Sequence, residues 1–131
     1  IQEISTAVQH HLPVKVFILN NQYLGMVRQW QELLHGGRYS ESYAEALPDF
    51  VKLAECFGAV GLQATKPSEV DDVIKEMILT DNMVIVDVRV DQKENCYPMI
   101  PSGSPHNEMI LSSEAKAVSS GGISEKGKVL V

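Results

Sequence analysis

Three short apolar runs alternate with amphipathic segments along the chain, and this alternation restricts the possible folds more than any other feature. The runs are VKVFIL at residues 14–19, AVGLQA at 59–64 and MVIVDVRV at 83–90. Apolar runs of this length are typical of strands in a parallel sheet, and the first is predicted to be buried on both faces. Strands that alternate with helices form a parallel sheet with helices on its faces. The predicted fold class is therefore α/β.

The segments between these runs show helical spacing of apolar residues. The predicted helices cover residues 1–12, 24–34, 48–57 and 70–78. Pro13 is expected to end the first helix, and Gly36 and Gly37 to end the second. Pro48 is expected to open the third helix, after a polar loop at residues 38–47.

The domain organisation follows from length and composition. A chain of 131 residues predicts one compact domain, and we assign residues 1–110 to it. Within this domain, residues 96–110 contain three prolines and are expected to form an extended strap over the site. Residues 111–131 carry too little apolar area to order themselves and are predicted to be a flexible tail. Helical spacing begins at Ile1 with no capping residue before it, so we interpret the chain as a piece of a longer polypeptide.

Charge and composition argue against several partners. The net charge is −6 and there is no basic cluster, which disfavours nucleic acid and anionic membrane surfaces. No apolar run approaches the roughly 20 residues of a membrane helix, and nothing resembles a signal peptide. Cys56 and Cys96 have no metal-ligand spacing, and Cys56 is predicted to be a small buried hydrophobic residue. These features fit a reducing, cytoplasmic setting.

The first apolar run ends in two adjacent asparagines, Asn20 and Asn21, shortly before the helix predicted to begin near Gly25. In open parallel sheets, ligands bind beyond the carboxyl ends of the strands. A helix N-terminus suits a phosphate group, and an amide oxygen with a backbone carbonyl suits Mg²⁺. Two asparagines after a strand are also common in an ordinary turn, so composition alone leaves both interpretations open.

Several motifs occur in the order that is found in one enzyme family. The Asn20-Asn21 pair resembles the end of the thiamine-diphosphate motif, which begins with Gly-Asp-Gly. NNQYLGMVRQWQ at residues 20–31, LPDFVKLAECFG at 47–58 and PMIPSG at 98–103 resemble the catalytic (large) subunit of acetohydroxyacid synthase, also called acetolactate synthase. The resemblance runs from Ile1 to about Ile110. It implies part of a Rossmann-like, three-layer domain that binds thiamine diphosphate.

The resemblance also implies roles for individual residues. Mg²⁺ would be held by the Asn21 side chain and the Tyr23 backbone carbonyl, and by an aspartate of Gly-Asp-Gly that has no counterpart in this chain. Asn20 would brace the turn. The residues implied to line the diphosphate and thiazolium are Leu24, Gly25 and Met26. The candidates for the substrate channel are Met26, Val27, Trp30, Ser102 and Gly103.

The implied activity is a transferase reaction of branched-chain amino-acid biosynthesis, in which pyruvate is decarboxylated and condensed with a second 2-ketoacid. No catalytic residue is assigned to this chain, because the family's catalytic glutamate lies in a domain with no counterpart here. The isolated chain is therefore predicted to be inactive. The resemblance further implies FAD in the full-length enzyme, through a domain absent from this chain. It also implies a homodimer or tetramer of the full-length subunit, with a small regulatory subunit as a candidate partner.

Other interpretations remain open for the chain and for several residues. The chain could be another thiamine-diphosphate-dependent decarboxylase or carboligase, or a non-catalytic α/β binding module. Trp30 and the PMIPSG segment argue against the first of these. At the residue level, Met26 and Trp30 are also compatible with an ordinary core. Arg28 and the pair His10 and His11 are expected to be solvated.

Overall fold

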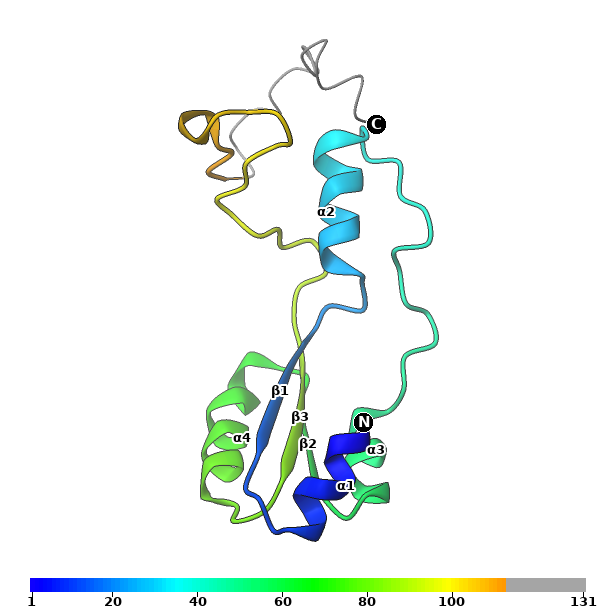
Figure 1. The fold of residues 1–131 in the computed structure, drawn as a ribbon, viewed down its shortest axis with the longest axis vertical. Helices are drawn as coiled ribbons and strands as arrows, with labels where there is room; N and C mark the ends of the chain where they lie inside the picture. Colours follow the sequence, from blue (N-terminus) through cyan, green and yellow to red (C-terminus); the bar gives the residue numbers. More distant parts are fainter. Residues whose placement is uncertain (113–131) are drawn as a thin grey trace. The chain divides into compact units, whose positions relative to one another are not determined.

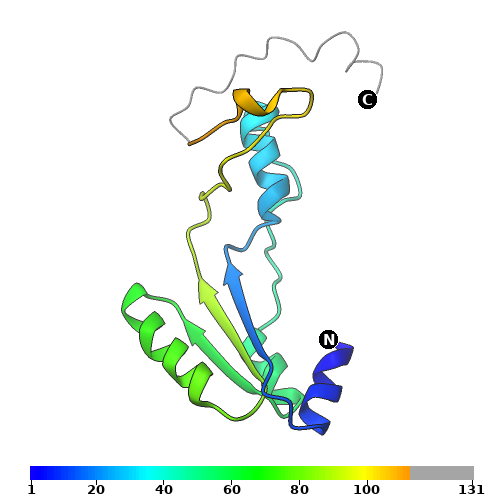
Figure 2. The same cartoon turned by 60° about the vertical axis from the view of Figure 1, so that its left-hand side comes forward.

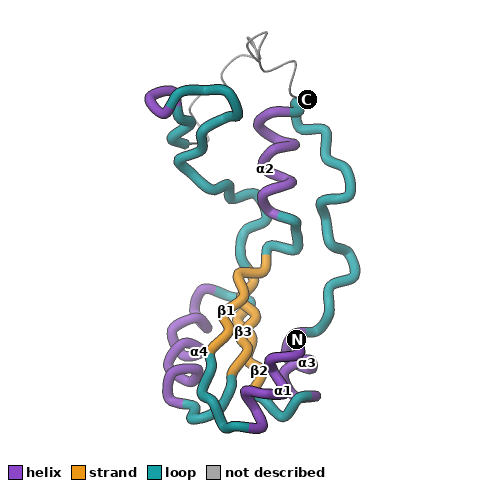
Figure 3. The backbone as a smooth tube through the Cα atoms, viewed as in Figure 1, coloured by secondary structure: helices purple, strands orange, loops and turns teal. Residues whose placement is uncertain are grey.

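The computed structural model describes residues 1–112, which fall into two compact units. The first unit comprises residues 1–22 and 45–92, and the second comprises residues 23–44 and the described residues from 93 to 112. Figure 3 shows the helices, strands and loops along the chain. The elements of the first unit are α1 (Gln2–Gln9), β1 (Lys15–Asn20), α3 (Phe50–Cys56), β2 (Val60–Ala64), α4 (Pro67–Leu79) and β3 (Val84–Arg89).

The three strands form one parallel sheet in the order β1-β3-β2. Phe17 of β1 and Leu62 of β2 both lie opposite Val86 of the central strand β3. This arrangement confirms the predicted α/β class and the three predicted strands. The central strand is buried along almost its whole length, which agrees with its near-continuous apolar sequence.

Helices cover both faces of this sheet, as Figures 1 and 2 show. On one face, Val84, Val86 and Val88 of β3 pack with apolar residues of α4. On the other face, Ile85 packs with residues of α1 and α3. The alternation of β3 side chains between two apolar layers follows from the two-residue period of a strand. The first unit therefore has three layers, as predicted.

The first predicted strand is not buried on both faces in the described chain. Phe17 is 39% exposed and Leu19 is 66% exposed. Both lie in register with the β3 residues that face α4, but α4 packs on β2 and β3. Because β1 is an edge strand of this sheet, its apolar side chains on that face have no helix above them.

The second unit contains α2 (Gly25–Leu34) and the short 3₁₀ helix η1 (His106–Glu108). Gly36 and Gly37 follow α2 with φ of 63° and 70°, the left-handed conformation predicted to end this helix. Residues 96–110 contain η1 and one antiparallel bridge, between Met99 and Ile110. The rest of this segment is a loop. The extended strap over the site stays a prediction.

Two expectations about individual residues are wrong. Cys56 is exposed, not buried. The inward-facing residues here are Phe50 and Ala54 of α3 and Phe57 directly after it. A residue two positions after Ala54 points to the other side of the helix. The first helix ends at Gln9, before Pro13, because His11 adopts a φ of 52°.

The structure describes the chain as far as residue 112. The flexible tail was predicted for residues 111–131, and all of it except residues 111 and 112 lies outside the described residues. Between residues 1 and 112, no helix is long and apolar enough to cross a bilayer.

Candidate functional site

The two asparagines lie where β1 ends, and Asn20 is tied into a local turn. Asn20 is 5% exposed, and its Oδ1 accepts a hydrogen bond from the backbone N–H of Gln22 at 3.1 Å. Its Nδ2 donates to Asp87 Oδ1 at 2.8 Å. Gln22 adopts a φ of 60°, which closes the turn directly after Asn21. The turn predicted from Asn-Asn is therefore present, and Asn20 braces it.

Asp87 is the polar centre of this end of the sheet. Its side chain is 2% exposed and accepts hydrogen bonds from Asn20 and, at 3.1 Å, from Gln63 Nε2. Arg89 Nε lies 3.6 Å from Asp87 Oδ2. Asp87 was not among the predicted site residues, although its sequence carries a signal: it is a lone carboxylate inside the apolar run MVIVDVRV.

The beginning of α2 is the second element predicted to bind the cofactor. Leu24 is the N-cap residue, no side chain caps this end, and the first turn carries no acidic residue. The Leu24 N–H donates to the Ser42 carbonyl at 2.8 Å, next to the bridge between Tyr23 and Tyr43. The first-turn N–H groups of an uncapped helix are suitable donors for an anionic ligand.

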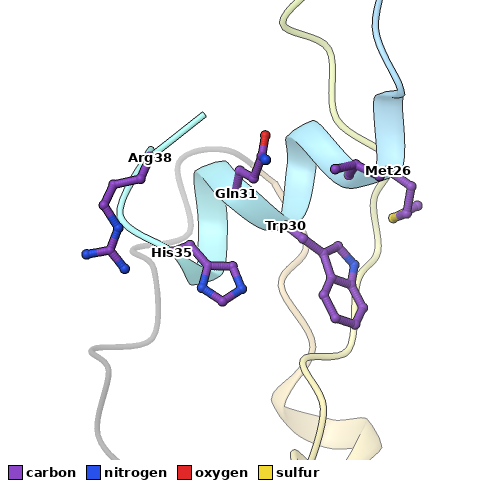
Figure 4. A pocket seen from close by; sticks show the side chains of 6 residues that line it. Met26, Trp30, Gln31, His35 and Arg38 are labelled. Atoms are coloured by element: carbon purple, nitrogen blue, oxygen red, sulfur yellow. The ribbon is translucent and has the colours of Figure 1, made fainter. Parts of the chain in front are cut away.

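Three of the five predicted channel residues line one pocket of about 610 Å³ in the second unit. Met26, Val27 and Trp30 are 54%, 47% and 45% exposed, so the core interpretation of Met26 and Trp30 is not supported in the described chain. Figure 4 shows Met26 and Trp30 extending from α2 into this region. The other lining residues are Gln31, His35 and Arg38.

The remaining two channel candidates lie elsewhere in the same unit. Ser102 and Gly103 form a turn that is closed by a hydrogen bond from the Ser104 N–H to the Pro101 carbonyl at 3.0 Å. Gly103 has a φ of 81°, which a non-glycine residue would adopt only with strain. Neither Ser102 nor Gly103 is among the residues that line the pocket.

Arg28 was expected to be a solvated loop residue, but it is a buried residue of α2. It is 7% exposed and pairs with Glu32 at 2.8 Å. Its guanidinium carbon lies 5.4 Å from the ring centre of Tyr23 and 5.3 Å from that of Tyr39. Stacking on two aromatic rings compensates the guanidinium for lost water. Partial burial of the phenol and the nearby Glu32 carboxylate raise the pKa of Tyr39 above its ordinary value.

Gln29 is the second buried polar residue of α2, and it was not among the predicted site residues. Its side-chain amide forms two hydrogen bonds with the backbone of Cys96 and one, at 3.1 Å, with the sulfur of Met99. These bonds attach the beginning of the strap to α2. Asn95 adds a bond from its Nδ2 to Glu32 Oε1 at 3.0 Å.

The predicted metal and cofactor residues belong to both units. Asn21 belongs to the first unit, whose first stretch ends at Gln22. Tyr23, Leu24, Gly25 and Met26 belong to the second unit. In the described part of the chain, no group of three His, Cys, Asp or Glu side chains could hold a metal ion. A metal bound by an amide and a carbonyl does not need such a group.

Comparisons of this chain with protein families and with individual proteins all point to the same family. Residues 1–88 match the family described as thiamine pyrophosphate enzyme, C-terminal TPP binding domain. The chain is 49% identical over 113 residues to the acetolactate synthase large subunit of Haemophilus influenzae. It is 50% identical over 115 residues to the acetolactate synthase isozyme 3 large subunit of Escherichia coli. Both alignments cover 86% of this chain and 20% of the relative, so the chain spans about a fifth of those proteins.

A solved structure supports the same family. A thiamine diphosphate-dependent 4-hydroxybenzoylformate decarboxylase of Rhodococcus jostii is similar to this chain with a TM-score of 0.62 and 27% identity. The similarity covers 70% of this chain and 17% of the decarboxylase.

Proposed function

Because the chain belongs to the thiamine pyrophosphate enzymes through their C-terminal TPP binding domain, we propose that it is the cofactor-binding part of an acetolactate synthase catalytic subunit. The observation that carries this proposal is the identity of 49% and 50% to two acetolactate synthase large subunits over 86% of the chain. The proposed reaction is the decarboxylation of pyruvate and its condensation with a second 2-ketoacid. This is a transferase reaction of branched-chain amino-acid biosynthesis.

The proposed metal is Mg²⁺, bound by the Asn21 side-chain oxygen and the Tyr23 backbone carbonyl. Both are hard, neutral oxygen donors, and Mg²⁺ is commonly bound by few protein groups together with phosphate oxygens. The braced turn at Asn20 supports this assignment, because it restricts the backbone on which Asn21 lies.

The proposed diphosphate site is the start of α2, at Leu24, Gly25 and Met26. The absence of a side-chain cap and of first-turn acidic residues in this helix supports the assignment, since nothing there competes with or repels an anion. Thiamine diphosphate, when bound, would supply the electron sink for decarboxylation, and this chain's residues would hold and orient it.

The proposed substrate wall consists of Met26, Val27 and Trp30. All three side chains are exposed and line the same pocket, which supports this role. The indole of Trp30 offers a large, rigid apolar surface with one N–H donor. Ser102 and Gly103 are proposed to lie at the mouth of the channel, and the support for this is the PMIPSG resemblance.

Further proposals concern the whole polypeptide. We assign FAD to residues outside this chain, and we expect a homodimer or tetramer that works in the cytoplasm with a small regulatory subunit. The names of the relatives support this last point, because they are called large subunits.

An assay of the full-length polypeptide that carries this chain tests the proposed function. Acetolactate should form from pyruvate only when both thiamine diphosphate and Mg²⁺ are present. The similarity to a solved decarboxylase keeps a second candidate, a decarboxylase of the same family. Release of free aldehyde without acetolactate would favour that candidate, and activity that ignores the cofactor would contradict both.

A further inference from the structure

Asp87 is a buried carboxylate that has no role in the proposed reaction. It lies near the carboxyl end of the central strand β3 and is 2% exposed. Burying a carboxylate is unfavourable unless its oxygens accept hydrogen bonds or face a cation. Here Asn20 donates to one oxygen at 2.8 Å and Gln63 to the other at 3.1 Å. The arrangement satisfies the carboxylate and places it directly beside the first of the two asparagines.

The chemistry of a carboxylate determines how Asn20 is oriented. An ionised carboxylate only accepts hydrogen bonds, whereas an amide has one donating and one accepting end. Asn20 must therefore turn its Nδ2 toward Asp87, which leaves Oδ1 to accept from the Gln22 N–H at 3.1 Å. If the amide were reversed, two donors would face each other at Gln22. Asp87 thus selects the one orientation of Asn20 that closes the turn.

Further hydrogen bonds connect the same turn to the chain that follows β3. The Val90 N–H donates to the Asn20 carbonyl at 3.2 Å. Gln92 Nε2 donates to Gln22 Oε1 at 2.8 Å. Asn21 therefore lies between two residues that are both held by residues 87–92.

We propose that Asp87 is a positioning residue for the magnesium ligand Asn21, acting through the orientation of the Asn20 amide. This inference rests on the proposed function, because it takes Asn21 as a ligand of Mg²⁺. Partners that orient a metal ligand without touching the metal commonly change metal affinity about 10- to 100-fold when they are mutated. Asp87 is not among the proposed ligands of the metal, so its effect is assigned to positioning alone.

The variant Asp87→Asn isolates this role because it changes one group and almost no volume. The Oδ2 side of Asp87 faces two donors, Gln63 Nε2 and Arg89 Nε, so the new amide should keep its oxygen on that side and turn its NH2 toward Asn20 Nδ2. Reversal of the Asn20 amide would relieve this clash, but it would break the bond to the Gln22 N–H. The variant therefore loses either the bond between Asn20 and residue 87 or the bond that closes the turn.

The experiment is a titration of Mg²⁺ at fixed thiamine diphosphate on the full-length polypeptide, with bound cofactor as the signal. We expect Asp87→Asn and Asn20→Ala each to raise the half-saturating Mg²⁺ concentration about tenfold or more. The double variant should have the same half-saturating Mg²⁺ concentration as Asn20→Ala alone, because both changes act through the same contact between Asp87 and Asn20. The matched control is Gln63→Leu, which removes the other donor to Asp87 and leaves Asn20 in place. It should keep the normal half-saturation.

The outcomes separate the two proposals. If the unmodified polypeptide binds no thiamine diphosphate with Mg²⁺, the proposed function fails. If it binds cofactor normally but Asp87→Asn only lowers the melting temperature, Asp87 has a purely structural role and the inference is overturned. Additive effects in the double variant would overturn it as well. If Asp87→Asn does not fold, Asn20→Ala alone tests the inference. A normal half-saturating Mg²⁺ concentration in that variant would contradict the proposed action of Asp87 through Asn20.

Discussion

Gln29 and Cys96 are joined by two hydrogen bonds between one side-chain amide and one backbone residue. The Cys96 N–H donates to Gln29 Oε1 at 2.6 Å, and Gln29 Nε2 donates to the Cys96 carbonyl at 3.0 Å. Gln29 is 2% exposed, whereas Trp30, the next residue of α2, is 45% exposed. The pairing attaches one side of α2 to the strap and leaves the neighbouring side to line the pocket.

The substitution Gln29→Leu should release the beginning of the strap. It removes both bonds to Cys96 at nearly constant volume, and we expect a loss of about 1–3 kcal/mol of stability. Hydrogen exchange of the Cys96 amide should become faster, while the Ser104 amide, which bonds to the Pro101 carbonyl and has no contact with Gln29, serves as an internal reference. Gln31→Leu is the control on the same helix, because Gln31 makes one bond to the Ser40 carbonyl. Unchanged exchange at Cys96 would contradict the pairing.

The substitution Asn21→Ala should weaken magnesium-dependent cofactor binding more than Asn20→Ala does. The first removes a proposed direct ligand of an ion that demands near-octahedral geometry, whereas the second removes only the support of the turn. Cofactor titrations at a series of fixed Mg²⁺ concentrations on the full-length polypeptide measure the difference. If Asn21→Ala and the unmodified protein bind the cofactor with equal affinity, Asn21 is only a turn residue and not a metal ligand.

The substitution Trp30→Ala should change acceptor choice and leave decarboxylation of the first pyruvate intact. A methylene contact in an apolar pocket contributes about 1–3 kcal/mol, so preference for 2-ketobutyrate over pyruvate should fall roughly ten- to a hundred-fold. Competition between the two acceptors measures this ratio. Leu34→Ala is the control, because Leu34 lies on the same helix, is similarly exposed and does not line the pocket.

A melting curve of Trp30→Ala separates this role from a core role. Truncation of a core tryptophan would cost about 3–5 kcal/mol. A large fall in melting temperature with an unchanged acceptor ratio would show that Trp30 is a core residue in the full-length protein.

The substitution Gly61→Ala should destabilise the first unit by about 1–3 kcal/mol. A Cβ at this position would lie 2.6 Å from the Val51 backbone oxygen and 2.7 Å from its Cα, so α3 would have to move away from β2. Thermal or denaturant unfolding measures the loss. Adding Val51→Ala should give little relief, because the closest atoms belong to the backbone. Full rescue by that second change would show that the clash lies in the side chain instead.

The substitution Glu69→Gln should lower the melting temperature near pH 7 and have little effect in acid. The Glu69 carboxylate accepts bonds from the Thr65 N–H at 2.8 Å and the Lys66 N–H at 3.1 Å, just before α4. These backbone bonds hold the pKa of Glu69 below its ordinary value of 4.5. A lowered pKa in the folded state means that the carboxylate stabilises the fold above pH 4.5, and that this contribution disappears as pH falls through the lowered value.

Melting curves across this pH range check the Glu69 prediction. Glu76→Gln, a change of the same kind in the last turn of α4, is the control, because Glu76 accepts neither of these two backbone bonds. A Glu69→Gln effect that persists at low pH would point to lost packing instead of lost charge.

The sequence by itself determined the helices, the strands and the parallel sheet, because hydrophobic periodicity is a local property. VKVFIL, AVGLQA and MVIVDVRV all became strands of one sheet, and the glycines after α2 end that helix as predicted. The Asn20-Asn21 turn was also foreseen, since it depends only on neighbours in the chain.

Only the tertiary structure decided which polar side chains are buried and which apolar ones are exposed. Asp87 accepts hydrogen bonds from Asn20 and Gln63, 67 and 24 positions away, and Gln29 bonds with Cys96, 67 positions away. No local pattern shows such partners. Leu19 is exposed because its strand lies at the sheet edge, away from α4. Burial depends on strand order and helix placement, which arise from contacts between distant segments and not from the period of any one of them.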